Sequence, residues 1–369
     1  MKKIVFIVLS LIVMTTFTFC SSPQDWFYKR SSFQGTPLKK NLSLQNTDYT
    51  KARLDSFENY LKKLHTTSLM VVQNGEVIYK YGNTSKINYL ASCRKSVLSM
   101  LYGKYVENGT INLKETIGEI GIDEDDGLLP IEKKATVNDI ITARSGVFHI
   151  PANGGYDTQN VKKRGSVEPG TYFLYNNWDF NVAGHILELK SGNTIYEELE
   201  QQLAIPLGFE DWNIKNQKKY YKKKKSRYPA YHMYLSTRDM AKVGQLMLNE
   251  GKWNGKQLIS KNWINKITTT VTPTAVVTQE RFGWPKDYLV QLSYGYMWWL
   301  FDRFYDNPDF EGAYYATGWG GQFIMVIPKL NMVIAHKTRV DLVTLTGLAK
   351  HNVSDPQFFM LVNRFTSKK

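Results

Sequence analysis

The chain has 369 residues, of which 43% are hydrophobic and 14% aromatic, and its formal net charge is +14. This length and composition exclude a disordered chain and a repeat solenoid, and they allow one catalytic domain with a cleft between two lobes. The positive charge raises the question of an anionic partner. We expect no nucleic-acid partner, because no helix-turn-helix, zinc-finger or RNA-binding motif accompanies the charge.

The N-terminus has the pattern of an export signal. Lysines at positions 2 and 3 precede an apolar stretch, 4–14, that is too short to span a membrane well. Cys20 resembles the lipidated cysteine of bacterial lipoproteins, although Phe19 stands where those proteins usually have a small residue. Secretion without a lipid and an uncleaved anchor are the alternatives.

We therefore predict an exported protein of the periplasm or cell surface, lipid-anchored to a bacterial membrane. It has three predicted parts: a lipoprotein-type signal peptide at 1–20, a tether at 21–45 and a catalytic domain at 46–369. Cys20 and Cys93 are the two cysteines, so lipidation of Cys20 would leave no partner for a disulfide in the mature chain.

A β-hairpin is the first element predicted in the domain. Strand-like runs at 69–73 and 76–80 are joined by Asn74-Gly75, a dipeptide that tolerates the positive φ angles of a tight turn. A helix is predicted over 92–107, where apolar residues recur at near-helical spacing.

Two polar residues mark helix starts in the middle of the chain. Thr136 is placed to cap a helix over 137–143, and Ser236 with Asp239 has the spacing of a capping box. A basic run at 218–227 lies between them. We expect this run to be a solvated loop, with anionic membrane or cell-wall polymer as the contact if it binds a partner.

The C-terminal third returns to strands. The predicted elements are strands over 294–300, 322–327 and 332–336, a turn at 328–331 and an amphipathic helix after Ser354. Strands at both ends with helices between them predict an α/β (α+β) fold, in which an antiparallel sheet flanked by helices is built from both chain ends. A mainly helical lobe, about 112–234, is inserted and leaves a cleft.

Ser92 and Lys95 are the first candidates for chemistry. Residues three apart on a helix share a face, so the amine of Lys95 can approach the hydroxyl of Ser92. A lysine can take the proton of a serine only when burial and neighbouring cations lower its pKa from about 10.4. On this pair alone, a capping serine with an exposed lysine is the simpler interpretation, so other segments must decide.

Three segments resemble, in order, the motifs of the penicillin-binding-protein/β-lactamase type of serine hydrolase. Residues 90–96 are similar to the Ser-x-x-Lys motif, 169–177 contain Tyr-x-Asn as Tyr175 and Asn177, and 317–322 resemble the third motif. The relatives indicated are class C β-lactamases, DD-peptidases and their esterase and amide-hydrolase cousins. The resemblance runs from about residue 65 to the C-terminus.

This resemblance implies the roles of four side chains. Ser92 attacks a carbonyl group, and Lys95 and Tyr175 share the proton transfers. Asn177 orients Lys95 and the substrate. Water then releases the acyl group by the same route.

The third motif supplies the remaining site residues. The resemblance implies an oxyanion hole made by the backbone amides of Ser92 and Gln322, the residue that follows Trp319-Gly320-Gly321. Glycines let a substrate approach the backbone closely. Trp319 departs from the Lys or His of β-lactamases and DD-peptidases, which holds a substrate carboxylate. Its ring is expected to stack on an apolar acyl group or to line a cation site.

The sequence thus predicts a serine hydrolase that cleaves a small-molecule ester, amide or peptide through an acyl-enzyme. A β-lactamase or DD-peptidase is one alternative. A catalytically weak protein that binds cell-wall or peptide ligands is another. The absence of a cation in the third motif and the basic run at 218–227 favour it. Loops at 147–168 and 268–290 would set specificity.

No cofactor and no metal is expected. The six histidines show no His-x-x-x-His or Cys/His spacing, and no phosphate loop or dinucleotide motif occurs. A Ser-His-Asp triad stays open, although no Gly-x-Ser-x-Gly elbow occurs. Cys93 is predicted to be a buried packing residue, because it would point away from the catalytic face.

Overall fold

The computed structural model describes residues 35–41, 49–154, 159–277, 288–340 and 352–367. The predicted signal peptide, Cys20 and most of the predicted tether lie outside these residues. Residues Gln34–Lys369 form one structural unit, and the fold below is that of its described part. No helix in the described ranges combines the length and the apolar character needed to cross a membrane.

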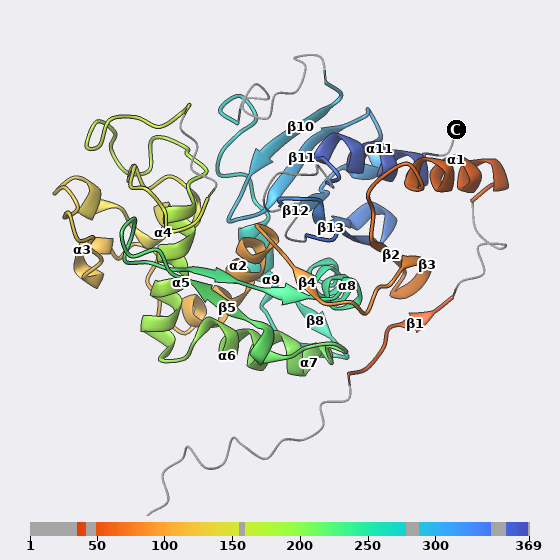
Figure 1. Cartoon of the computed structure of the whole chain (residues 1–369), viewed down its shortest axis with the longest axis horizontal. Coiled ribbons are helices and arrows are strands. Elements are labelled where there is room, and N and C mark those ends of the chain that lie inside the picture. Colours follow the sequence, from red (N-terminus) through yellow and green to blue (C-terminus); the bar gives the residue numbers. More distant parts are fainter. Residues whose placement is uncertain (1–34, 42–48, 155–158, 278–287, 341–351, 368–369) are drawn as a thin grey trace, which may run out of the picture. The chain divides into compact units, whose positions relative to one another are not determined.

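An eight-stranded sheet forms the centre of the fold (Figure 1). Its strands, in spatial order, are β1 (Lys39–Lys40), β3 (Glu76–Gly82), β2 (Ser68–Gln73), β14 (Met332–Lys337), β13 (Gln322–Ile327), β12 (Tyr314–Gly318), β11 (Trp299–Phe304) and β10 (Val290–Tyr294). All neighbours are antiparallel except β1 and β3. Both chain ends therefore build the sheet, as predicted.

The edge strand β1 changes one predicted boundary. Lys39 pairs with Glu76 and Lys40 with Val77, so this part of the predicted tether belongs to the edge of the sheet. The backbone amide of Thr36 also donates to the carbonyl oxygen of Gly208. Polar composition alone does not distinguish a solvated tether from a short edge strand, because an edge strand also faces water.

The N-terminal hairpin is confirmed. Asn74 has a φ of 53° and Gly75 a φ of 78°, the left-handed pair that joins β2 to β3 with the twist of a tight hairpin. The turn between β13 and β14 is confirmed as well, with Asn331 in the left-handed region. In both cases a short turn sequence decides the pairing of the flanking strands.

The single strand predicted over 294–300 is wrong. Strand β10 ends at Tyr294 and β11 begins at Trp299, and the amide of Gly295 donates to the carbonyl oxygen of Trp298 across the turn. A Cβ atom on Gly295 would lie 2.7 Å from the carbonyl oxygen of Ile267, so the chain can turn here only with glycine. Because the turn is buried, its residues are apolar and lack the polar residues by which a turn is usually predicted from sequence.

Helices cover both faces of the sheet. On β13, Phe323 stacks on Phe358 of α11 (Asp355–Thr366) at 4.2 Å between ring centroids, and α1 (Lys51–Leu61) packs beside α11. Ile324, the next residue, faces Gly244 of α8 (Thr237–Leu248). Since neighbouring strand residues point to opposite faces, α11 and α8 lie on opposite sides of the sheet (Figure 1).

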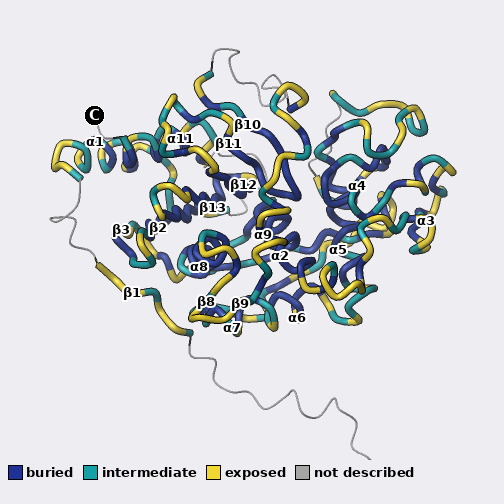
Figure 2. Tube along the Cα trace, turned by 180° about the vertical axis from the view of Figure 1, so that it is seen from behind, coloured by how far each residue is buried: buried dark blue, intermediate teal, exposed yellow. Residues whose placement is uncertain are grey.

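The helical lobe is inserted between β3 and β10. Its main elements are α2 (Cys93–Glu107), α3 (Ile117–Ile120), α4 (Val137–Ile141), α5 (Asn177–Ser191), α6 (Ile195–Leu199) and α7 (Ile205–Leu207). Small strand pairs and one more helix complete it: β4 (Asn88–Tyr89) with β7 (Tyr234–Leu235), β5 (Lys218–Tyr220) with β6 (Ala230–His232), β8 (Lys252–Trp253) with β9 (Lys256–Gln257), and α9 (Lys261–Ile267). Figure 2 shows α2 and the central strands as buried trace. This arrangement confirms the predicted α/β fold with an inserted helical lobe.

The two predicted helix caps differ in outcome. Thr136 and Asp139 form a full capping box, although α4 ends at Ile141 rather than 143. The side chain of Ser236 accepts from the amide of Asp239, but the Asp239 side chain does not bond to the amide of Ser236. The predicted capping box is therefore wrong. The buried carboxylate of Asp239 instead accepts from the amides of Glu210 and Asp211 at 2.7 and 3.1 Å, because that segment packs against the helix start.

Candidate active site

Ser92, Lys95 and Tyr175 meet at the start of α2. The Nζ atom of Lys95 lies 2.8 Å from the Oγ atom of Ser92 and 2.8 Å from the Oη atom of Tyr175. Ser92 is half-buried, whereas Lys95 is 1% exposed. The arrangement gives the serine hydroxyl one nearby amine and gives that amine one nearby phenol.

The backbone before Ser92 is held in an unusual conformation. Ala91 has a φ of 49°, a region that alanine seldom adopts. The amide of Leu90 donates to the carbonyl oxygen of Met233, and the amide of Cys93 donates back to Leu90. Strained residues persist only where their surroundings hold them, and they gather at functional sites. The strain here places Ser92 at the N-cap of α2, and the amides of Arg94 and Lys95 donate to the carbonyl oxygens of Ala91 and Ser92.

Cys93 points away from this site, as predicted. It is fully buried, and its thiol donates to the carbonyl oxygen of Gln322 at 3.1 Å. Burial raises the pKa of the thiol, which therefore stays protonated. Cys93 links α2 to β13 and is no nucleophile at neutral pH.

Aromatic rings surround the amine of Lys95. Its Nζ atom lies 4.2 Å from the ring centroid of Tyr175 and 4.6 Å from that of Phe180 on α5. Trp299 and Tyr294 lie 5.5 and 6.0 Å from the Tyr175 ring. These rings keep bulk water from the amine and fix the phenol of Tyr175. The sequence did not predict Phe180 and Trp299 as site residues, because an aromatic residue outside a motif gives no indication of which residues it will contact.

Asn177 lies beside the site but does not bond to Lys95. Its amide nitrogen donates to the carbonyl oxygen of Gly154, and its buried amide oxygen, the atom that could accept from Lys95, has no hydrogen-bond partner among the described residues. The side chain that caps α5 is that of Asn176. The amide oxygen of Asn177 is therefore available for the substrate contact that the resemblance implies.

The third motif touches the Ser92 segment through Gly318. A Cβ atom on Gly318 would lie 2.4 Å from the carbonyl oxygen of Leu90 and 3.1 Å from the Cβ atom of Ala91. The following turn has φ angles of 85° at Gly320 and 98° at Gly321. Glycine at these places lets the end of β12 reach the nucleophile segment, which no larger residue permits.

Two residues of this turn have opposite surroundings. Gln322 is fully buried at the start of β13, and its side-chain amide donates to the carbonyl oxygen of Thr338 at 2.8 Å. Trp319 is 53% exposed. An exposed indole provides an apolar surface without charge, and its expected stacking role stays a prediction.

Buried polar groups brace the site from behind. The Nδ1 atom of His336 lies 2.9 Å from the carbonyl oxygen of Gly321, and burial lowers the pKa of His336 to about 4, so it is neutral. The carboxyl group of Asp355 accepts from Tyr315 and Thr317, each at 2.9 Å, and burial raises its pKa. Sequence analysis missed both bracing roles, since neither residue has a motif neighbour.

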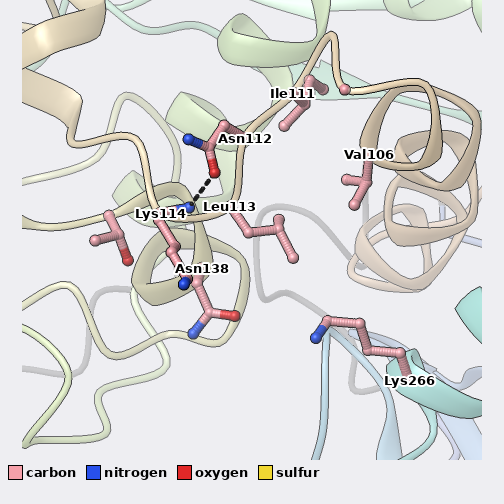
Figure 3. A pocket seen from close by; sticks show the side chains of 9 residues that line it. Val106, Ile111, Asn112, Leu113, Lys114, Asn138 and Lys266 are labelled. Carbon is pink, nitrogen blue, oxygen red and sulfur yellow. Dashed lines mark hydrogen bonds between the residues drawn. The ribbon is translucent and has the colours of Figure 1, made fainter.

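Two hollows in the described structure lie away from Ser92. One, of about 720 Å³, lies at the far end of α2 and is lined by residues such as Val106, Leu113 and Lys266 (Figure 3). The other, of about 550 Å³, lies between residues 223–226 of the basic run and 148–150. The end of α2 at Glu107 is roughly 20 Å from its start at 1.5 Å per residue, so the first hollow is separate from the nucleophile.

The described residues contain no group of three or more His, Cys, Asp and Glu side chains that could hold a metal ion. His149 pairs instead with the carboxylates of Asp126 at 3.1 Å and Glu124 at 3.5 Å.

Known proteins share this fold. Solved structures that are similar to the chain include the following three. The first is a protein provisionally assigned as a 6-aminohexanoate-dimer hydrolase, from Bacillus anthracis (TM-score 0.60, 20% identity, covering 94% of this chain and 93% of that one). The second is a penicillin-binding protein homologue from Caulobacter crescentus (0.60, 14%, 88% and 99%). The third is a family VIII carboxylesterase (0.60, 16%, 86% and 96%). At such identities the likeness shows the fold.

Sequence comparison identifies the family. An uncharacterised protein from Alkalihalophilus pseudofirmus is 22% identical over 299 residues, which cover 72% of this chain and 81% of that protein. Residues 54–339 match the beta-lactamase family, and this match spans well over half of the chain. The chain therefore belongs to the beta-lactamase family of hydrolases.

Proposed function

We propose that the protein is a serine hydrolase that cleaves a small ester or amide through an acyl-enzyme on Ser92. The observation that carries this proposal is the position of the Lys95 amine, 2.8 Å from both the Ser92 hydroxyl and the Tyr175 hydroxyl. A weak nucleophile, a base within hydrogen-bond reach and a second proton carrier are what acyl transfer requires.

The proposed reaction has two halves. The Oγ atom of Ser92 forms a bond to the carbonyl carbon of the substrate while its proton passes to the neutral amine of Lys95. Tyr175 gives a proton to the leaving alcohol or amine as the tetrahedral intermediate collapses, and it recovers one from Lys95. Water then attacks the acyl-enzyme with the same groups in reverse order and frees Ser92. The amides of Ser92 and Gln322 are the proposed oxyanion donors.

The substrate class follows from the charge of the third motif. Trp319 is exposed and uncharged at the position where β-lactamases and DD-peptidases carry a cation. We therefore propose an ester or amide with an apolar acyl group in preference to a β-lactam or a peptide carboxylate. Efficient cleavage of a chromogenic cephalosporin, with slow cleavage of p-nitrophenyl acyl esters, would reverse this preference.

The test is the intact mass of the protein after exposure to a fluorophosphonate probe. We expect one adduct on the wild type, none on Ser92→Ala and one on Cys93→Ala, the matched control on the same helix. A folded wild-type protein that takes up no probe would contradict the proposal. That outcome would favour the alternative of a catalytically weak protein that binds cell-wall or peptide ligands.

We also propose that the chain is exported and anchored through a lipid on Cys20, which tethers the domain to a bacterial membrane. The support is the order of residues 1–22: two lysines, a short apolar stretch and the cysteine. Radiolabelled palmitate should enter the wild-type chain and not Cys20→Ala when both are produced in a bacterial host. Equal labelling, or none, would contradict lipidation.

A further inference from the structure

The basic run at 218–227 forms an exposed loop whose two ends are fixed. Every residue from Tyr220 to Lys225 is exposed. Before this loop, β5 pairs with β6. After it, the hydroxyl of Ser226 and the backbone amide of Arg227 donate to the buried carboxylate of Glu124. The fold therefore holds the loop in place while its side chains face water.

The lysines of this loop, Lys222–Lys225, form no ion pair with a carboxylate of the described residues. Three acidic residues line the hollow of about 550 Å³ beside them, and each already has a partner. Asp126 pairs with Arg164 at 3.1 Å, and Asp125 lies 3.5 Å from Arg227. The third has the hydrogen bonds given above. The loop thus carries positive charges that no neighbouring carboxylate pairs with.

Exposed apolar side chains lie beside these charges. Tyr220 and Tyr221, which are 45% and 59% exposed, directly precede the lysines. Ile150 is 49% exposed and lines the same hollow as Lys223–Lys225. Tyrosine is enriched where a bilayer meets water, because its ring favours apolar surroundings and its hydroxyl favours water.

An anionic lipid bilayer matches both features. Its negative surface attracts each lysine that comes near it, and its headgroup region accepts aromatic and aliphatic side chains. The formal net charge of +14 adds a long-range attraction of the same sign. A soluble polyanion would use the lysines but would leave the apolar side chains in water.

We propose that Ile150 and Tyr220–Lys225, here named the basic surface, dock on the headgroups of an anionic lipid bilayer. The lysines contact the phosphate groups, and the tyrosines and Ile150 enter the interface. The docking is independent of the proposed acyl transfer on Ser92. It also does not require a lipid on Cys20, which would tether the chain to a bilayer of any charge.

The test measures how fast single lysines of the full chain are acetylated, by mass spectrometry of its peptides. Vesicles of phosphatidylcholine with about one-third phosphatidylglycerol should slow the acetylation of Lys222–Lys225 about fivefold relative to pure phosphatidylcholine. Raising NaCl to about 0.5 M should remove this protection, because salt screens the attraction.

Lys252 on β8 and Lys256 on β9 are the reference lysines. Both are exposed and lie outside the basic surface, so they should react equally with both kinds of vesicle. Any tether at the N-terminus is the same in both samples, so the result does not depend on it. Equal acetylation of Lys222–Lys225 in both samples, or equal protection of the reference lysines, would overturn the proposal.

Two variants test the apolar contacts. Tyr221→Ser and Ile150→Ser should each weaken the protection of Lys222–Lys225 about threefold, since each removes apolar area from the interface. Ile205→Ser is the matched control, because Ile205 on α7 is 54% exposed and lies outside the basic surface. An equal loss in Ile205→Ser, or no loss in the two variants, would overturn docking at a bilayer.

Poly(glycerol phosphate), a soluble polymer with phosphate charges, separates a bilayer from a free polyanion. We expect it to protect Lys222–Lys225 less than the anionic vesicles do. Protection as strong as that by the vesicles, and unchanged in Tyr221→Ser, would show that the loop binds a polyanion and would overturn the proposal.

Discussion

The Nζ atom of Lys337 lies 2.8 Å from the carbonyl oxygen of Asn88, four residues before Ser92, and the same amine donates to the carbonyl oxygen of Leu235. Lys337 is the last residue of β14 and is 2% exposed. One buried amine thus ties the central sheet to β4 and β7, the short strands that lead to the nucleophile and to α8. Its two carbonyl partners are neutral, so no opposite charge offsets the free-energy cost of burying the protonated amine.

The first prediction concerns this cost. Burial lowers the pKa of Lys337 from 10.5 to about 7. Between these two pH values the unfolded chain binds more protons than the folded one, so the free energy of unfolding rises with pH. Below pH 7 both states are charged and the full penalty is present.

Urea unfolding from pH 6 to 9.5 checks this prediction for the wild type and Lys337→Met. The wild-type curve should rise relative to the variant above pH 7, by at most about 1.4 kcal/mol per pH unit. Parallel curves would show that Lys337 keeps one protonation state across this range.

The second prediction concerns the proton carriers. Lys95→Met should lower kcat for an activated ester by about 10³-fold and Tyr175→Phe by about 10²-fold, because general acid–base groups contribute about 10²–10⁴-fold. Circular dichroism should show both variants folded. Lys104→Met is the control, since Lys104 is an exposed lysine on the same helix. Equal losses in Lys104→Met would mean that charge on α2, and not the geometry at Ser92, is responsible.

The third prediction concerns the contact between the third motif and the nucleophile segment. The added methyl group of Gly318→Ala would meet the carbonyl oxygen of Leu90 at 2.4 Å, so either β12 or the Ser92 segment must move. We expect a loss of about 1–3 kcal/mol in unfolding free energy, measured by urea denaturation, together with a large loss of kcat.

Gly154→Ala is the control for this change. Gly154 lies near Asn177, but a Cβ atom there would meet nothing within 4 Å. Its activity and stability should stay close to those of the wild type. A fully active Gly318→Ala variant would show that the close approach at Leu90 is dispensable.

The fourth prediction concerns specificity at the rim. Trp319→Ala should lower kcat/KM for esters with long or aromatic acyl groups about tenfold more than for acetyl esters, because the indole face offers apolar area. The melting temperature should hardly change, since Trp319 is 53% exposed. Trp253→Ala on β8 is the control. A uniform loss across all acyl groups would place the role of Trp319 in the reaction itself and not in acyl-group selection.

Much of the fold was predictable because local patterns decide local structure. The Asn74-Gly75 turn, the cap at Thr136 and the turn at Asn331 each depend on residues within a few positions of one another. Predictions were wrong where a distant segment intervened. Asp239 bonds to the 210–211 segment in place of its own helix start, and Gly295 turns the chain because Ile267 packs against it.

The sequence by itself determined the pair Ser92 and Lys95, because helical periodicity places residues three apart on one face and two further motifs follow in the family's order. Only the tertiary structure decided that the hydroxyl of Tyr175, 80 positions later, meets the amine of Lys95 inside a ring of aromatic side chains. It also decided that Trp319 faces solvent while Lys337 and His336 are buried behind the site. The physical reason is that such contacts depend on how the sheet from both chain ends packs against α2, and no local spacing encodes that packing.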